Sequence, residues 1–202
     1  DTYIIQHTKD TITETGTGAG DIDTIKLADI FIPSTYTLSN TKIEALDGSS
    51  LIKNMTLTGN TTTATIIIGG SKNDTLNGGT AADTLIGGAG NDLLYGGNDT
   101  ISDNLQGEIG NDIYIIQDTK DTITDTNGAN TIKLNSAFTG SALSLQETIA
   151  YNYSGANITK IDASAFISTT KAITLTGNAT SSTTIVGGSG NDTITGGTDV
   201  DS

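Results

Sequence analysis

A nine-residue pattern, repeated head to tail, most restricts how this chain can fold. Three copies abut without a gap at 69–77, 78–86 and 87–95. Each copy begins with two glycines and has an aspartate at the sixth position and a large apolar residue at the eighth. Another copy lies at 187–195, and irregular versions lie at 96–106, 107–115 and 196–202. So regular and short a period predicts a stack of identical turns and strands.

The chemistry of the repeat indicates what each turn and strand does. Paired glycines can adopt positive φ and turn backbone carbonyls inward, and the aspartate adds a carboxylate at the end of the same turn. The three residues around the eighth position form a short strand, which points Leu76, Leu85, Leu94 and Ile194 into a common interior. Two nonapeptides make one coil, so Asp74 should lie over Asp92.

Carboxylates stacked at the strand spacing of about 4.7 to 4.9 Å repel one another unless a cation lies between them. Calcium fits best, because it accepts six to eight hard oxygens at loose geometry, and several ions are expected. Without them a Gly-rich turn and a three-residue strand cannot offset about 1 to 2 kcal/mol of backbone entropy per residue, so folding should depend on calcium.

The candidate metal ligands are the aspartates of these turns and the glycines and asparagines beside them. Asp1 is included because it aligns with Asp112. They are Asp1, Asp74, Asp83, Asp92, Asp99, Asp112, Asp192 and Asp201, with Gly70, Asn73, Gly79, Gly88, Gly90, Asn91, Gly110, Asn111, Gly188, Gly190 and Asn191.

A second, longer repeat divides the chain. Residues 1–13 recur at 112–124 with two differences, and Thr24–Leu27 recurs as Thr131–Leu134. The sequence therefore predicts a first unit at 1–111, with spacer strands at 1–68 and nonapeptides at 69–111. An incomplete second unit follows at 112–202, with spacers at 112–186 and nonapeptides at 187–202. Both ends fall inside a motif, so we interpret the chain as an excerpt of a longer array.

The nonapeptides, and the Asp-x-Tyr-x-Ile spacer that follows them at 112–116, resemble the RTX or hemolysin-type calcium-binding repeats of secreted bacterial proteins. The resemblance implies an all-β fold, a right-handed parallel β-roll or β-helix, with calcium in the turns. It also implies type I secretion through a C-terminal signal absent from this excerpt. Spacer strands are expected at 3–6, 11–13, 22–27, 55–57 and 63–68, and short helical turns at 141–153 and 164–170.

Composition excludes several classes of function. The net charge of −14 would repel a nucleic-acid backbone. With one histidine and no cysteine, the chain has no disulfide and no Cys-ligated metal. It lacks an apolar run long enough for a membrane span, and it lacks the His-Glu-x-x-His and Gly-x-Ser-x-Gly motifs of hydrolases. Carboxylate pairs such as Asp21/Asp23 and Asp10/Glu14 are expected by coincidence in a chain with 23 acidic residues.

Three functional hypotheses remain open. The first is a non-enzymatic calcium-stabilised segment of an extracellular surface-layer protein or giant adhesin, in which calcium stiffens the rod and supports self-association. The second is an ice-binding or other adhesive Thr-rich face, although the threonines do not repeat at one fixed Thr-x-Thr site. The third is the calcium-binding export module of a secreted hydrolase.

Overall fold

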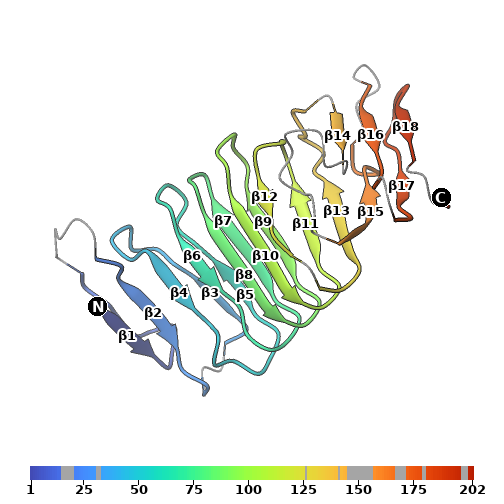
Figure 1. Cartoon of the computed structure of the whole chain (residues 1–202). Coiled ribbons are helices and arrows are strands. Elements are labelled where there is room, and N and C mark those ends of the chain that lie inside the picture. Colours follow the sequence, from blue (N-terminus) through green and yellow to red (C-terminus); the bar gives the residue numbers. More distant parts are fainter. Residues whose placement is uncertain are drawn as a thin grey trace.

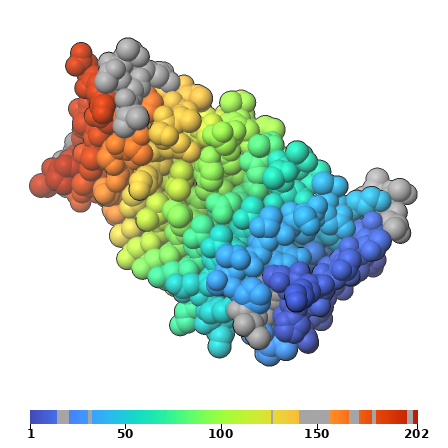
Figure 2. All heavy atoms as spheres, turned by 180° about the vertical axis from the view of Figure 1, so that it is seen from behind, coloured from blue at the N-terminus to red at the C-terminus, as the bar shows by residue number. Residues whose placement is uncertain are grey.

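The chain forms a parallel β-solenoid of about eight coils that rises steadily from the N-terminus to the C-terminus (Figure 1). The computed structural model describes residues 1–14, 21–30, 33–125, 127–140, 142–144, 157–166, 172–178, 181–196 and 200–202. Within these ranges every regular element is a strand. In the space-filling view of Figure 2 the colours follow one another along a single elongated body. The predicted all-β solenoid is confirmed.

From β2 onward, consecutive strands lie in different sheets of the solenoid. The bounds are β1 (Thr2–Ile5), β2 (Thr24–Leu27), β3 (Thr35–Thr37), β4 (Ala45–Asp47), β5 (Thr56–Thr58), β6 (Ile66–Ile68), β7 (Thr75–Gly79), β8 (Thr84–Ala89), β9 (Leu93–Gly97), β10 (Asn104–Ile109), β11 (Ile113–Ile116), β12 (Thr122–Ile123), β13 (Asn130–Leu134), β14 (Ala142–Ser144), β15 (Ile158–Asp162), β16 (Thr174–Thr176), β17 (Thr184–Val186) and β18 (Thr193–Thr195). One sheet has the order β1-β2-β4-β6-β8-β10-β12, the facing sheet runs from β3 through the odd-numbered strands to β17, and β14-β16-β18 form a third.

Two rows of apolar side chains fill the interior, because alternate residues of a strand point to opposite faces. Members of each row are register partners in neighbouring strands. The rows are Ile25, Leu46, Ile67, Leu85, Leu105 and Ile123 in one sheet and Leu57, Leu76, Leu94, Tyr114, Ile132 and Ile161 in the other, and none is more than 2% exposed. Burial of each such side chain is worth about 1.5 to 3 kcal/mol. These rows hold successive turns in fixed register.

Most expectations about the interior and the strands hold, and three are wrong. Leu76, Leu85 and Leu94 face the interior as predicted, but Ile194 is 51% exposed, because β18 is an edge strand of its described sheet. The expected strand at 11–13 is irregular chain, although its second copy contains β12. Residues 142–144 form β14 and not a helical turn, and most of 141–153, like 167–170, lies outside the described residues.

Candidate metal centre

Aspartates that directly precede the strands stack into two ladders, one beside each main sheet. In the first ladder, Asp92 Oδ1 accepts a hydrogen bond from the backbone N–H of Asp74 at 2.7 Å. Asp112 Oδ1 accepts one from Asp92 N–H at 2.7 Å. Each carboxylate thus ties its own turn to the equivalent turn one coil earlier. The structure therefore confirms the predicted placement of Asp74 over Asp92.

The second ladder contains Asp83, Asp103 and Asp121. Asp103 Oδ1 accepts the N–H of Asp83 at 2.8 Å, and Asp121 Oδ1 accepts the N–H of Asp103 at 3.2 Å. Sequence reasoning missed Asp103, because two extra residues follow Gly97 and move the aspartate away from the sixth position, and it missed Asp121, because no glycine pair precedes that residue. The preserved signal is an apolar residue two positions later, Leu105 or Ile123, just as Leu85 follows Asp83.

The second oxygen of several ladder carboxylates is buried without a donor. Within the described part of the chain, Oδ2 of Asp83, Asp92 and Asp112 has no hydrogen-bond partner. Asp74 differs, because Gly70 N–H donates to its Oδ2 at 2.6 Å. A buried carboxylate oxygen without a donor destabilises the fold unless a proton or a cation neutralises it.

This buried environment raises the pKa values of the ladder aspartates. Burial, acting chiefly through desolvation of the charged form, raises the pKa of Asp83, Asp92 and Asp121 to about 7. The same cause raises the pKa of Asp103 and Asp112 to about 6. Neighbouring carboxylates add to the effect in each case. The folded chain therefore binds protons or other cations along these ladders more tightly than isolated aspartates would.

Glycine α-carbons leave room beside these oxygens. A Cβ built on Gly78 would lie 2.5 Å from Asp83 Oδ2 and 2.2 Å from the carbonyl oxygen of Gly96 one coil further on. A Cβ on Gly87 would lie 2.4 Å from Asp92 Oδ2 and 2.8 Å from the Gly107 oxygen. We call the space beside each of these glycine α-carbons a cradle. Each cradle is lined by a carboxylate and by a backbone carbonyl from the adjacent coil. These are the hard oxygen ligands that calcium accepts in flexible geometry, so the residues fit the ion.

Glycines and asparagines shape the outer part of the turns. Gly88 and Gly90 have φ of 105° and 131°, a region that favours glycine. The side chains of Asn73, Asn91 and Asn111 form an exposed ladder of their own: Asn73 Oδ1 accepts Asn91 N–H at 2.9 Å, and Asn91 Oδ1 accepts Asn111 N–H at 2.8 Å. These side-chain oxygens hold neighbouring coils together, and the asparagines' part in metal binding stays a prediction.

The remaining predicted glycines and Asn191 lie in the same kinds of turn. Gly110 and Gly190 also have positive φ, at 149° and 145°. A Cβ on Gly79 would lie 2.0 Å from the Asn60 carbonyl oxygen, and one on Gly188 2.4 Å from that of Phe166, so only glycine fits there. Asn191 is exposed. These residues set the path of the turns.

The other predicted aspartates have different surroundings. Asp192 and Asp201 repeat the ladder bond once each: Asp192 Oδ1 accepts Ile173 N–H at 3.2 Å, and Asp201 Oδ1 accepts Thr183 N–H at 2.8 Å. Asp99 lies outside both ladders and accepts Ile101 N–H at 2.5 Å. Asp1 has a side chain that is 82% exposed. The regular motif therefore positions Asp74, Asp83, Asp92 and Asp112 best.

Fold and turns together define a parallel β-roll built from Gly-Asp turns. Residues 68–101 and 180–202 match the family model of the RTX calcium-binding nonapeptide repeat, in four copies. These two segments are therefore RTX calcium-binding repeats. Such repeats bind calcium, and the proteins that contain them are generally secreted. Searches of curated proteins and of solved structures each gave no match. Among the described residues, no helix is long and apolar enough to span a membrane.

Proposed function

We propose that this chain is a non-enzymatic, calcium-dependent structural segment of a secreted bacterial surface protein of the surface-layer or adhesin type. The observation that carries the proposal is the pair of aspartate ladders, in which the buried Oδ2 atoms of Asp83, Asp92 and Asp112 need a cation or a proton. Calcium between adjacent turns would neutralise the ladders and couple each coil to the next. A solenoid cross-linked in this way resists bending and unfolding, as a surface scaffold must.

The ligands proposed for these ions are Asp74, Asp83, Asp92, Asp103 and Asp112, together with carbonyl oxygens of the paired glycines. Their carboxylate oxygens lie beside the glycine cradles of successive coils. The Asp83–Asp103 pair extends the ion row through the irregular turn after Gly97. Several ions follow from this arrangement, because the cradles repeat from coil to coil.

The test is a calcium titration of the whole chain, followed by far-UV circular dichroism and small-angle scattering. Calcium should convert a disordered or expanded chain into an extended β-rich rod, and magnesium at the same concentration should do so poorly, because it requires stricter octahedral geometry. Asp92→Asn should raise the calcium concentration needed for folding. Asp47→Asn is the matched control, because Asp47 is partly buried, lies outside the ladders and already pairs with Lys26, 3.2 Å away. Equal β content and shape with and without calcium would refute the proposal.

A Thr-rich adhesive or ice-binding face is a second candidate, favoured by one observation. Threonines in register form short Thr-x-Thr ladders: Thr35 and Thr37 on β3 lie beside Thr56 and Thr58 on β5. The same arrangement pairs β16 with β18. Neither ladder continues into the next coil, where Asn77 lies beside Thr58 and Ala142 and Ser144 lie beside β16, so one fixed Thr-x-Thr site does not repeat along the rod. A measurement of thermal hysteresis tests this candidate, and its absence at millimolar protein would eliminate ice binding.

A further inference from the structure

A buried polar cluster lies where the last nonapeptide of the first unit passes into the spacer. The hydroxyl of Tyr114, which is fully buried, donates to Asp125 Oδ2 at 2.6 Å and accepts the backbone N–H of Gly107 at 2.9 Å. Asn130 Nδ2 donates to the same Asp125 oxygen at 2.9 Å. Side chains from β11 and β13 thus hold the Asp125 carboxylate in one position.

Asp112 faces this carboxylate with a free oxygen. Asp112 is 1% exposed; its Oδ1 accepts the N–H of Asp92, and among the described residues its Oδ2 has no hydrogen-bond partner. Asp125, 4% exposed, lies within hydrogen-bonding reach of Asp112, and after burial itself its charge is the next influence that raises the pKa of Asp112. Two buried acceptors that face each other require a cation or a proton between them.

The first long repeat contains an equivalent cluster near the N-terminus. By the correspondence of 1–13 with 112–124 and of Thr24 with Thr131, the positions of Asp112, Asp125 and Asn130 are taken by Asp1, Glu14 and Asp23. Tyr3, the counterpart of Tyr114, donates its hydroxyl to Glu14.

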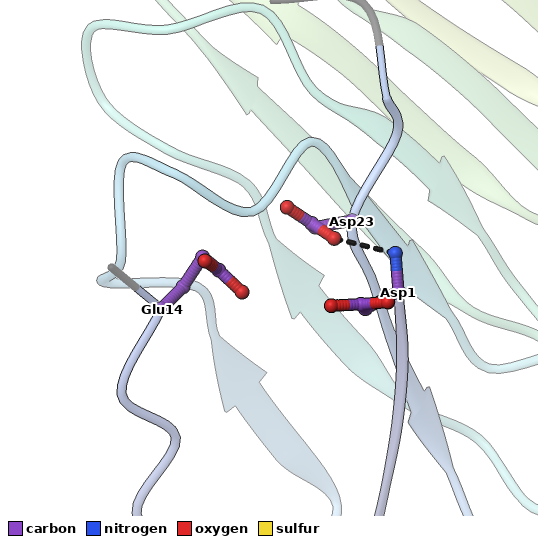
Figure 3. Close-up of side chains that lie close together, drawn as sticks. All are labelled: Asp1, Glu14 and Asp23. Atoms are coloured by element: carbon purple, nitrogen blue, oxygen red, sulfur yellow. Dashed lines mark hydrogen bonds and ion pairs between the residues drawn. The ribbon is translucent and has the colours of Figure 1, made fainter. Parts of the chain in front are cut away.

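The bond between the outer two positions is also repeated. The Asp1 ammonium donates to Asp23 Oδ1 at 2.5 Å, just as Asp112 N–H donates to Asn130 Oδ1 at 2.8 Å. One carboxylate oxygen from each of Asp1, Glu14 and Asp23 lies within 4.8 Å of the others, and Figure 3 shows the three side chains gathered together. Two copies that differ in two of these four side chains therefore retain the same arrangement.

We propose that each long repeat has a spacer cation site, distinct from the nonapeptide turns, that binds a hard divalent cation such as calcium. In the buried copy the ion lies between Asp112 Oδ2 and the Asp125 carboxylate, with Tyr114 and Asn130 as the frame that orients Asp125. In the other copy Asp1, Glu14 and Asp23 supply three carboxylates. Only oxygen ligands are present, which favours calcium over zinc or copper.

The inference goes beyond the proposed function, because Asp125, Glu14 and Asp23 lie outside the nonapeptides. Of the residues in the buried copy, only Asp112 belongs both to a nonapeptide ladder, as its last aspartate, and to the spacer site, as a ligand. The site links the last nonapeptide turn to the following coil. It would therefore fix the spacer against the calcium-bound block.

The experiment counts tightly bound calcium ions per chain at pH 7.5, by equilibrium dialysis of the complete 202-residue chain. Asp125→Asn and Glu14→Gln should each remove one ion, because each variant replaces one charged ligand while an acceptor for the tyrosine hydroxyl remains. Asp47→Asn, the control outside both kinds of site, should remove none. Asp92→Asn should lose nonapeptide calcium while the Glu14-dependent ion persists, which separates failure of this inference from failure of the proposed function.

Terbium provides a second readout, since the chain has six tyrosines and no tryptophan. Terbium bound beside Tyr114 should emit on tyrosine excitation, and both Tyr114→Phe and Asp125→Asn should remove that component of the emission. If Asp125→Asn fails to fold by circular dichroism, Glu14→Gln decides, because Glu14 lies near the surface. An unchanged ion count in Glu14→Gln, or in a folded Asp125→Asn, would overturn the inference and leave a shared proton between Asp112 and Asp125.

Discussion

Removal of calcium should make folding strongly dependent on pH. The ladder carboxyls have folded-state pKa values of about 6 to 7, above the ordinary value of 3.8. The folded state therefore holds protons more tightly than the unfolded state does. Its stability is greatest when these groups are protonated and is lost as the pH rises from about 4 to about 7.

The loss of folding free energy between pH 5 and pH 8 is large enough to unfold the calcium-free chain. Between pH 5 and pH 8, a carboxyl with a folded-state pKa of about 7 costs the folded state roughly 2 to 3 kcal/mol, and one with a pKa of about 6 costs roughly 1 to 1.5 kcal/mol. Five such groups are present: Asp83, Asp92, Asp103, Asp112 and Asp121. Even if coupling and relaxation halve the total, about 5 kcal/mol is lost. Because domains are stable by about 5 to 15 kcal/mol, this loss can unfold the calcium-free chain.

The assay is far-UV circular dichroism of resin-stripped, calcium-free protein from pH 5 to pH 8. We expect β structure at pH 5, its loss by pH 8, and its recovery at pH 8 when millimolar calcium is added. Asp92→Asn removes one titrating group and should move the midpoint to higher pH. Asp47→Asn should not, because Lys26 and Ser49 lower the pKa of Asp47 despite its partial burial. Identical spectra at pH 5 and pH 8 without calcium would refute the reasoning.

Two further substitutions test the interior and the cradles. Leu94→Ala, in the centre of the inner row, should lower the free energy of unfolding of the calcium-bound chain by about 2 to 5 kcal/mol. Urea denaturation in saturating calcium measures this, and a loss below about 1 kcal/mol would mean that the row is loosely packed. Gly78→Ala places a methyl group 2.5 Å from Asp83 Oδ2 and 2.2 Å from the Gly96 oxygen, so it should reduce calcium affinity at that cradle at least tenfold. Calorimetric titration checks this, and Gly177→Ala, outside the nonapeptides, serves as the control for loss of a glycine, because the nearest atom to an added Cβ there is 3.1 Å away.

The regular part of the fold could be predicted because its period is short. An apolar residue two positions after each aspartate fixes both the interior row and the carboxylate ladder, so Leu76, Leu85 and Leu94 and their aspartates were placed correctly. Asp103 shows where this reasoning fails. Two inserted residues displace the aspartate from its expected position, yet the strand register between β8 and β10 restores it to the ladder. Backbone pairing, and not sequence spacing, determines which carboxylate joins a ladder.

The spacer cluster could not be predicted for a different reason. Glu14 and Asp23 read as a chance grouping in an acidic chain, and nothing in their spacing shows that a coil brings them beside Asp1. The informative signal was the long repeat. In both units a tyrosine, Tyr3 or Tyr114, is followed at the same distance along the chain by an acidic residue, Glu14 or Asp125. Equivalent positions that keep their chemistry while their neighbours change indicate a shared structural role.

The first ladder ends at an uncharged residue, and this limits where the fold needs ions. Asn130 occupies the next position after Asp112, and its side-chain oxygen accepts Asp112 N–H with the geometry of the preceding aspartates. An amide makes the same coil-to-coil bond without adding a charge that must be neutralised, and its NH₂ group donates to Asp125. Ladder bonds therefore continue into the spacer without a further ladder carboxylate, and the carboxylate that Asp112 still faces there is Asp125 of the spacer site. Dependence on calcium should accordingly be concentrated in the coils between Met55, whose N–H donates to Asp74 at 2.7 Å, and Asn130.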